Sequence, residues 1–116
     1  MLEEMRFRDA LPVDGYGPGF FRVGGEVMRG GVLILPSGVR GWGGWDDVGV
    51  ILAEGPRLDV LFVGTGPSMI LVPPPFRRLA DDGGVGIEPM ASPQACRTYN
   101  VLLSEGRRVG LAALPI

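Results

Sequence analysis

The residues best suited to bind a small ligand lie where two predicted strands end. Gly64-Thr65-Gly66 follows one apolar run, and Ser92 follows a second run and opens a predicted helix. Ligands of open α/β sheets bind beyond the carboxyl ends of parallel strands, and the free N–H groups of a helix N-terminus favour an anion. The sequence therefore predicts a site for a small anion or for a partner's carboxylate. The candidate residues are Gly64, Thr65, Gly66, Ser92, Arg97, Thr98 and Asn100.

A second interpretation of these residues is purely structural: the two glycines make a tight turn, and Ser92 only caps its helix. They do not complete a nucleotide-binding motif. The third glycine of the dinucleotide fingerprint would stand at position 69, which is Met69, and a P-loop needs a lysine that the chain lacks.

Residue types exclude most catalytic and metal chemistry. With no histidine and one cysteine, the chain cannot form a Cys/His dyad or the usual zinc sites. The pairs Asp46-Asp47 and Asp81-Asp82 are more typical of solvated helix ends than of metal ligands. These residues therefore provide no His-based acid–base pair and no metal site of the usual kind.

Cys96 is the one candidate nucleophile. It lies one turn inside the predicted helix, where the helix dipole can lower the pKa of a thiol. Helical spacing also places it with Tyr99 and Leu103 on the apolar face, where a free cysteine packs as a small hydrophobic residue. We expect the second arrangement, and the reactivity of the thiol against pH separates the two.

Trp42-Gly43-Gly44-Trp45 places two indole rings around two glycines. The rings either close the edge of a core, with the glycines allowing close backbone approach, or form an exposed aromatic patch that binds a partner. Trp42 and Trp45 are therefore a second candidate surface.

Composition limits the partners and the setting. The chain has 116 residues and a net charge of −2, which argues against general nucleic-acid binding. Its start, Met1 to Arg6, lacks the apolar core of a signal peptide, and no apolar run is long enough for a membrane helix. We expect a cytoplasmic protein that does not insert into a membrane. A homo-oligomer stays open because the hydrophobic content is high, at 46%.

The elements that position these residues form one domain, 1–116, made of a polar lead-in (1–10), a Gly-rich part with short strands (11–45) and an α/β core (46–116). Strands are predicted at 11–13, 20–23, 26–29, 32–35, 59–63, 85–90 and 109–114. A short helix through Glu54 is predicted with Asp46 or Asp47 as its cap, a second helix at 76–82, and a third from Ser92, as N-cap, to a left-handed Gly106. Strand, helix, strand, helix, strand predicts a parallel core in the second half, and the first third predicts an antiparallel layer.

Several motifs together resemble one family. The most specific string is Glu88-Pro89-Met90, Ala95 to Leu102 and Glu105-Gly106-Arg107-Arg108-Val109. Further matches are Tyr16-Gly17-Pro18-Gly19-Phe20, Leu33-Ile34-Leu35-Pro36 with Trp42 or Trp45 beyond it, and Leu61 to Gly66. From about Asp14 to Ala113 the chain resembles the Mth-nine-three-eight-type domain family, a domain of unknown function that includes mitochondrial complex I assembly factor three. The linker Ser92-Pro93-Gln94 departs from the family pattern, which weakens any transfer of a shared ligand site to this helix start.

The resemblance implies a three-layer α/β fold with a mixed central sheet, a parallel βαβαβ C-terminal half, helices on both faces and an extra small β layer from the N-terminal third. It implies no established enzymatic activity, metal or cofactor. It implies binding of other proteins during the assembly of respiratory or other membrane complexes. The alternative function is a small-molecule or anion-binding domain, or an unrecognised enzyme, with its site at the carboxyl ends of the parallel strands.

Overall fold

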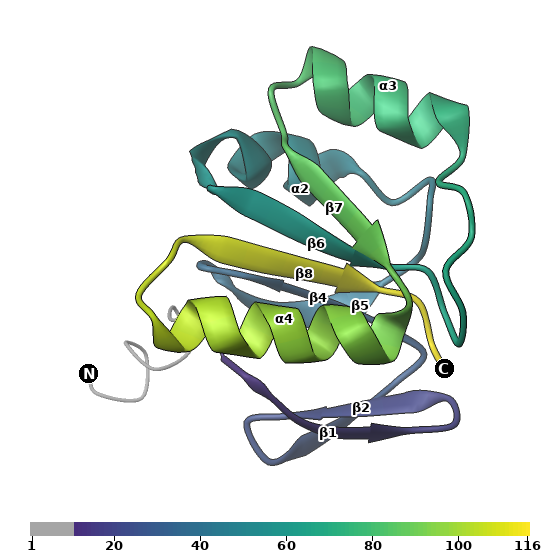
Figure 1. Ribbon diagram of the computed structural model, residues 1–116, viewed down its shortest axis with the longest axis vertical. Helices are drawn as coiled ribbons and strands as arrows, with labels where there is room; N and C mark the ends of the chain where they lie inside the picture. The colour runs from purple at the N-terminus through teal and green to yellow at the C-terminus, as the bar shows by residue number, and fades with distance from the viewer. Residues whose placement is uncertain (1–10) are drawn as a thin grey trace.

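The computed structural model describes residues 11–116, so the lead-in predicted at 1–10 lies outside the described residues. The described chain forms three layers around a five-stranded sheet (Figure 1). The strands are β1 (Val13–Gly17), β2 (Phe20–Val23), β3 (Glu26–Arg29), β4 (Gly31–Leu35), β5 (Gly38–Trp42), β6 (Val60–Gly64), β7 (Ile87–Met90) and β8 (Val109–Ala113). The helices are α2 (Gly49–Glu54), α3 (Pro74–Asp82) and α4 (Ser92–Ser104), with a 3-10 turn, η1 (Gly55–Arg57). Across residues 11–116, no helix has the length and apolar character needed to cross a membrane.

The five-stranded sheet has the order β5-β4-β8-β6-β7. β6 pairs in parallel with both β7 and β8, whereas β4 pairs antiparallel with β5 and β8. α3 connects β6 to β7, and α4 connects β7 to β8, so the second half of the chain is the predicted βαβαβ unit. The mixed sheet and the three-layer fold class expected from the sequence are confirmed.

The core lies on both faces of this sheet because each strand sends alternate side chains to opposite sides. Ile34, Phe62 and Leu111 pack in the layer that holds α4 and β2. Leu33 and Leu61 pack with α2 and α3 on the other face. Strands that are buried on both faces carry continuous apolar runs, which is why the sequence pattern of β4 and β6 does not alternate.

β1, β2 and β3 form the extra small layer, an antiparallel sheet beside α4 (Figure 1). β2 and β3 begin and end where the sequence predicts. The prediction of a strand at 11–13 is wrong, because β1 runs from Val13 to Gly17 and only Pro18 and Gly19 form the turn. Pairing with β2 holds Gly15 to Gly17 in the sheet, so tertiary context outweighs the low strand propensity of glycine. For the same reason the sequence missed the Gly-containing β5, which pairs along β4.

The C-terminal end of α4 forms as predicted. Gly106 has a φ of 81°, which suits glycine because it has no Cβ. The N–H of Gly106 donates to the Leu103 carbonyl, and the N–H of Arg107 donates to that of Leu102. These two bonds are the Schellman motif that ends many helices, and they lead the chain toward β8.

Two predicted helix starts are wrong. Ala91, not Ser92, occupies the cap position of α4, and no side chain caps the helix. α2 begins at Gly49 rather than at Asp46 or Asp47, since the Asp47 carboxylate accepts the backbone N–H of Gly43 instead. In both places the side chain that was predicted to cap the helix forms a hydrogen bond with a backbone group outside that helix instead.

Candidate functional site

Gly64 and Ser92 bring three segments into contact at the carboxyl end of β6. A Cβ at Gly64 would lie 2.6 Å from the Ser92 Oγ, so only glycine allows this approach. The Ser92 Oγ donates to the Leu114 carbonyl at 2.7 Å and accepts the N–H of Gly66 at 2.9 Å. Ser92 has no exposed surface. Its hydroxyl therefore joins the start of α4 to the end of β8 and to the loop after β6, rather than facing a ligand.

The Thr65 hydroxyl is hydrogen-bonded to backbone groups around the same loop. Thr65 is 4% exposed, and its Oγ1 lies 2.8 Å from the Ser68 carbonyl and 3.3 Å from the Met90 carbonyl. The same oxygen accepts the N–H of Ile70 at 3.2 Å. A hydroxyl has one donor and two acceptor lone pairs, so these partners satisfy it without a ligand. Thr65 therefore fixes the path of the chain between Ser68 and Ile70.

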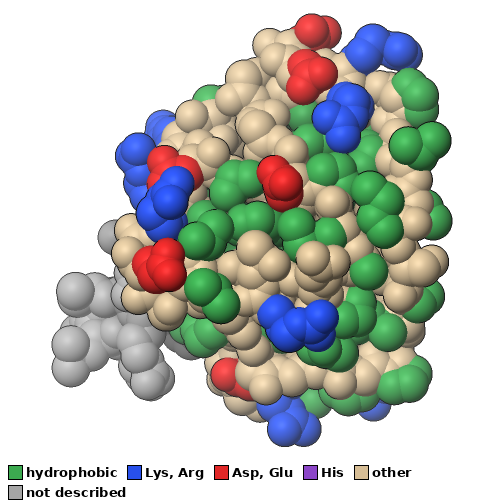
Figure 2. Space-filling view, in the orientation of Figure 1, with side chains coloured by type: hydrophobic (Ala, Val, Ile, Leu, Met, Phe, Trp, Pro, Cys, Tyr) green, Lys and Arg blue, Asp and Glu red, His purple; other side chains and the backbone are tan. Residues whose placement is uncertain are grey.

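The loop that Thr65 fixes carries exposed apolar side chains. Met69 is 56% exposed, Ile70 49% and Leu71 88%, whereas Val72 beside them is buried. We call Met69, Ile70 and Leu71 the apolar loop. Figure 2 shows hydrophobic side chains gathered along the right-hand edge of the molecule, where the connection from β6 to α3 runs in Figure 1. Large apolar groups side by side on a surface are typical of interaction sites.

Asn100 binds backbone on another part of the fold. Its Oδ1 accepts the N–H of Val13 and its Nδ2 donates to the Val13 carbonyl, both at 2.9 Å. The hydroxyl of Tyr99 donates to the Leu11 carbonyl at 2.8 Å. These bonds attach the start of β1 to α4, where pairing of β1 with β2 is irregular. Asn100 thus belongs to an internal hydrogen-bond network.

Arg97 lies on the exposed side of α4, where its Nη1 donates to the Tyr16 hydroxyl at 3.1 Å. Thr98 is half-buried on the same helix. Thr65, Ser92 and Asn100 each bind backbone in the interior, whereas Arg97 faces the small sheet. The structure therefore brings Gly64, Thr65, Gly66 and Ser92 together at the end of β6, whereas Arg97 and Asn100 contact β1 instead.

Cys96 is 1% exposed within the core beneath α4. Burial raises the pKa of its thiol to about 12, and the nearby charge of Arg97 opposes this shift only in part. Burial also raises the pKa of the neighbouring Tyr99 phenol. At neutral pH Cys96 is a protonated thiol without solvent access, which does not suit a nucleophile.

The tryptophans close one end of the core. Trp42 is 4% exposed, and its Nε1 donates to the Asp47 carbonyl at 2.9 Å. Its ring meets that of half-buried Trp45 edge-on at 5.5 Å, and both rings meet Phe76 of α3. The prediction of an exposed aromatic patch that includes Trp42 is therefore wrong. The aromatic cluster instead packs α3 against the sheet.

The sequence interpretation missed the apolar loop as a surface. The available signal was the apolar run 69–72 directly before three prolines, outside any predicted helix or strand. In residues 11–116 the structure contains no group of three or more Cys, Asp or Glu residues placed to hold a metal ion.

Comparison with known proteins places these features in a family. The family described as "protein of unknown function (DUF498/DUF598)" matches residues 13–114. An uncharacterised protein of Rhodobacter capsulatus is 47% identical over 97% of this chain and 91% of its own length. NADH dehydrogenase (ubiquinone) 1 alpha subcomplex assembly factor 3 of Bos taurus is 31% identical over 91% of this chain. The chain covers 61% of that bovine protein and 65% of its Mus musculus counterpart, so it spans about three-fifths of their length.

Solved structures share the fold. A Bartonella henselae protein described as an outer membrane protein has a TM-score of 0.85 and 31% identity, with 94% of this chain and 98% of that chain covered. A Bordetella pertussis protein described as a Mth938-like domain has a TM-score of 0.69 and 30% identity, with 90% and 85% covered. The protein MT938, at 13% identity and a TM-score of 0.64, shares the fold alone. These matches confirm the resemblance found in the sequence: the chain belongs to the DUF498/DUF598 family, whose solved relatives include Mth938-like domains.

Proposed function

We propose that this protein binds other proteins through the apolar loop and acts as an assembly factor for membrane protein complexes. The observation that carries this proposal is the exposure of three consecutive apolar side chains, with Leu71 at 88%. Burying one such side chain fully in an interface contributes roughly 1.5–3 kcal/mol. The proposed partner surface is therefore apolar, as on a subunit that is not yet assembled.

Thr65 gives the loop a defined shape before a partner arrives. Its Oγ1 accepts the N–H of Ile70 and lies within hydrogen-bond distance of the Ser68 carbonyl. A loop that is ordered in advance loses less conformational entropy on binding. In this proposal Gly64, Thr65 and Gly66 support the binding surface, and the partner touches the side chains beyond them.

The relatives support the direction of this proposal. Several are assembly factors of NADH dehydrogenase (ubiquinone) by name, and this chain aligns with 91% of its length to the bovine one. The chain spans about three-fifths of those proteins, so the proposal concerns the part that they share. A cytoplasmic setting and partners among membrane-complex subunits belong to the same proposal. An anion site at Thr65 and Ser92 finds no support, since both hydroxyls already bind backbone.

The test is co-purification from the native host with quantitative mass spectrometry. The variant Met69→Ser/Leu71→Ser removes apolar surface from exposed positions, so it should fold as the wild type does. Val101→Ser is the matched control, because Val101 is a 55% exposed aliphatic residue on α4, away from the apolar loop.

We expect subunits of a membrane complex to be enriched with the wild type and with Val101→Ser, and to be lost with the loop variant. Equal enrichment with all three proteins would show that the partner does not bind through the apolar loop. Enrichment of no membrane-complex subunit by any of them would refute the assembly role.

A further inference from the structure

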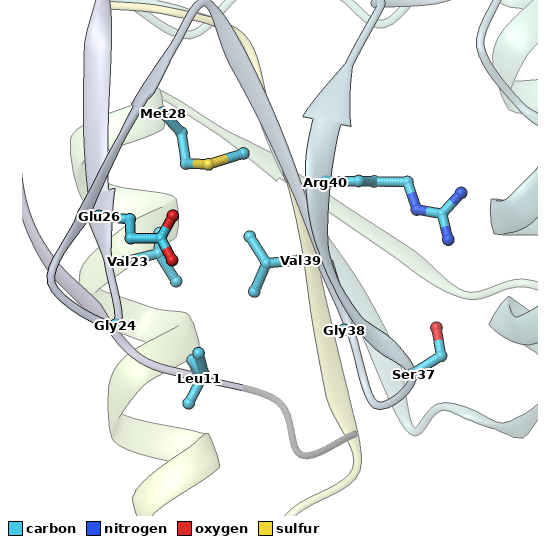
Figure 3. Close-up of a pocket in the computed structure, with 9 residues that line it drawn as sticks. All are labelled: Leu11, Val23, Gly24, Glu26, Met28, Ser37, Gly38, Val39 and Arg40. Atoms are coloured by element: carbon cyan, nitrogen blue, oxygen red, sulfur yellow. The ribbon is translucent and has the colours of Figure 1, made fainter. Parts of the chain in front are cut away.

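A cavity of about 360 Å³ lies between the small sheet and the edge of the five-stranded sheet (Figure 3). Val23, Met28 and Val39 give it apolar walls, and Leu11 closes one end. Met28 and Val39 point toward each other across the space, and the Glu26 carboxylate points into it from the β3 side (Figure 3). Ser37 and Arg40 line it as well, so the cavity combines apolar walls with polar groups, among them the Glu26 carboxylate.

β5, which forms one wall of this cavity, is an edge strand. Among the described strands it pairs only with β4, so the backbone groups on its other side have no strand partner. Such an edge can bind an added strand. Gly41 presents no side chain there, and a Cβ built on it would meet only the Gly31 carbonyl oxygen, at 3.9 Å. Arg40, the one charged residue of β5, also lines the cavity, but its guanidinium points away from the side chains of Val39 and Glu26 (Figure 3).

We propose that this edge binds an extended segment of a partner protein, which pairs with β5, places one apolar side chain in the cavity and brings a basic side chain to Glu26. Side chains of a strand alternate between its faces, so residues i and i+2 lie on the same side. The segment therefore has the pattern apolar, any residue, basic. Main-chain hydrogen bonds provide affinity, and the cavity with its carboxylate provides specificity for the sequence of the segment. This site uses none of the residues of the apolar loop.

The carboxylate decides the charge of the segment. Within residues 11–116 no side chain forms an ion pair with Glu26, whereas Asp59 pairs with Arg107 and Arg108 elsewhere. The carboxylate of Asp14, on β1 of the same small sheet, accepts the N–H of Gly25. An Arg or Lys on the segment would meet a carboxylate whose negative charge has no cationic partner on these elements.

The test uses the whole protein, labelled with nitrogen-15, and the capped peptide acetyl-Thr-Leu-Thr-Arg-Thr-amide. Backbone amide shifts are followed during titration to millimolar peptide. We expect saturating shifts in Gly38–Trp42 and in Glu26–Arg29. Glu26→Lys should weaken binding about fivefold, because exposed ion pairs are modest in strength, and a peptide with Glu in place of Arg should recover it on that variant. Asp81→Lys on α3 changes the charge equally, away from the site, and should leave binding unchanged.

Two further probes separate the alternatives. Two N-methylated peptides each block one edge of the peptide backbone, and strand pairing predicts that only one of them loses binding. n-Pentylamine carries the apolar chain and the charge without a peptide backbone. If it gave the same shifts with the same affinity, the cavity would be a site for free amines and the strand proposal would be refuted. Absence of saturating shifts in β5 would refute it as well.

Discussion

Replacing Thr65 with valine tests whether the candidate site is a structural support for the apolar loop. Valine keeps the shape of threonine and removes the hydroxyl, which lies 2.8 Å from the Ser68 carbonyl and accepts the N–H of Ile70 at 3.2 Å. The substitution removes one donated and one accepted hydrogen bond, and each intramolecular hydrogen bond contributes about 0.5–1.5 kcal/mol net. We expect the free energy of unfolding to fall by about 1–2 kcal/mol.

Chemical denaturation measures this change, and hydrogen exchange at the Ile70 amide reports the loop directly. The Ile70 amide should exchange faster in Thr65→Val, while amides in the middle of β6 keep their protection. Thr98→Val is the matched control, because Thr98 is half-buried on α4 and forms no side-chain hydrogen bond within residues 11–116. A Thr65→Val protein as stable as the wild type, with unchanged exchange at Ile70, would refute the argument.

Three further predictions follow from the core and the surface. Gly64→Ala should destabilise the protein by roughly 1–3 kcal/mol, because its Cβ would lie 2.6 Å from the Ser92 Oγ. Gly15→Ala is the control, since no atom lies within 4 Å of its added carbon, and thermal unfolding of the two variants compares the effects. Burial raises the pKa of Cys96 from 9.0 to about 12, so its contribution to the free energy of unfolding should be fully present below pH 9 and decrease above it, as the thiol of the unfolded chain ionises. Denaturation at pH 8 and pH 10 measures this decrease, and Cys96→Ala should lack it. The backbone N–H of Arg108 and the side chain of Arg107 lower the pKa of Asp59, so its stabilising contribution is present above pH 3.8 and lost as the pH falls; Asp59→Asn should remove that acid dependence, and identical acid unfolding curves would contradict it.

The glycine pair at 64 and 66 shows how a functional motif and a packing motif can share one sequence. The pattern after a strand suggests a ligand-binding turn, yet Gly64 allows contact with Ser92 and Gly66 adopts a φ of 102°. The close approach at Gly64 involves Ser92 of α4 and Ala113 of β8, which are far away in the sequence. An isolated Gly-Thr-Gly cannot distinguish these roles, because either needs a residue without a side chain.

The sequence by itself determined the elements whose signals are local. Apolar spacing predicts the βαβαβ order and the apolar face of α4, and the backbone freedom of glycine predicts the left-handed turn at Gly106 just beyond the helix. Only the tertiary structure decided the roles of polar side chains. Ser92 binds Leu114 and Gly66, and Asn100 binds Val13, because a hydroxyl or an amide bonds whichever backbone group the fold brings near. Exposure of Leu71 and the cavity beside Val39 likewise depend on how the layers meet, which is a property of the packed chain rather than of any local stretch.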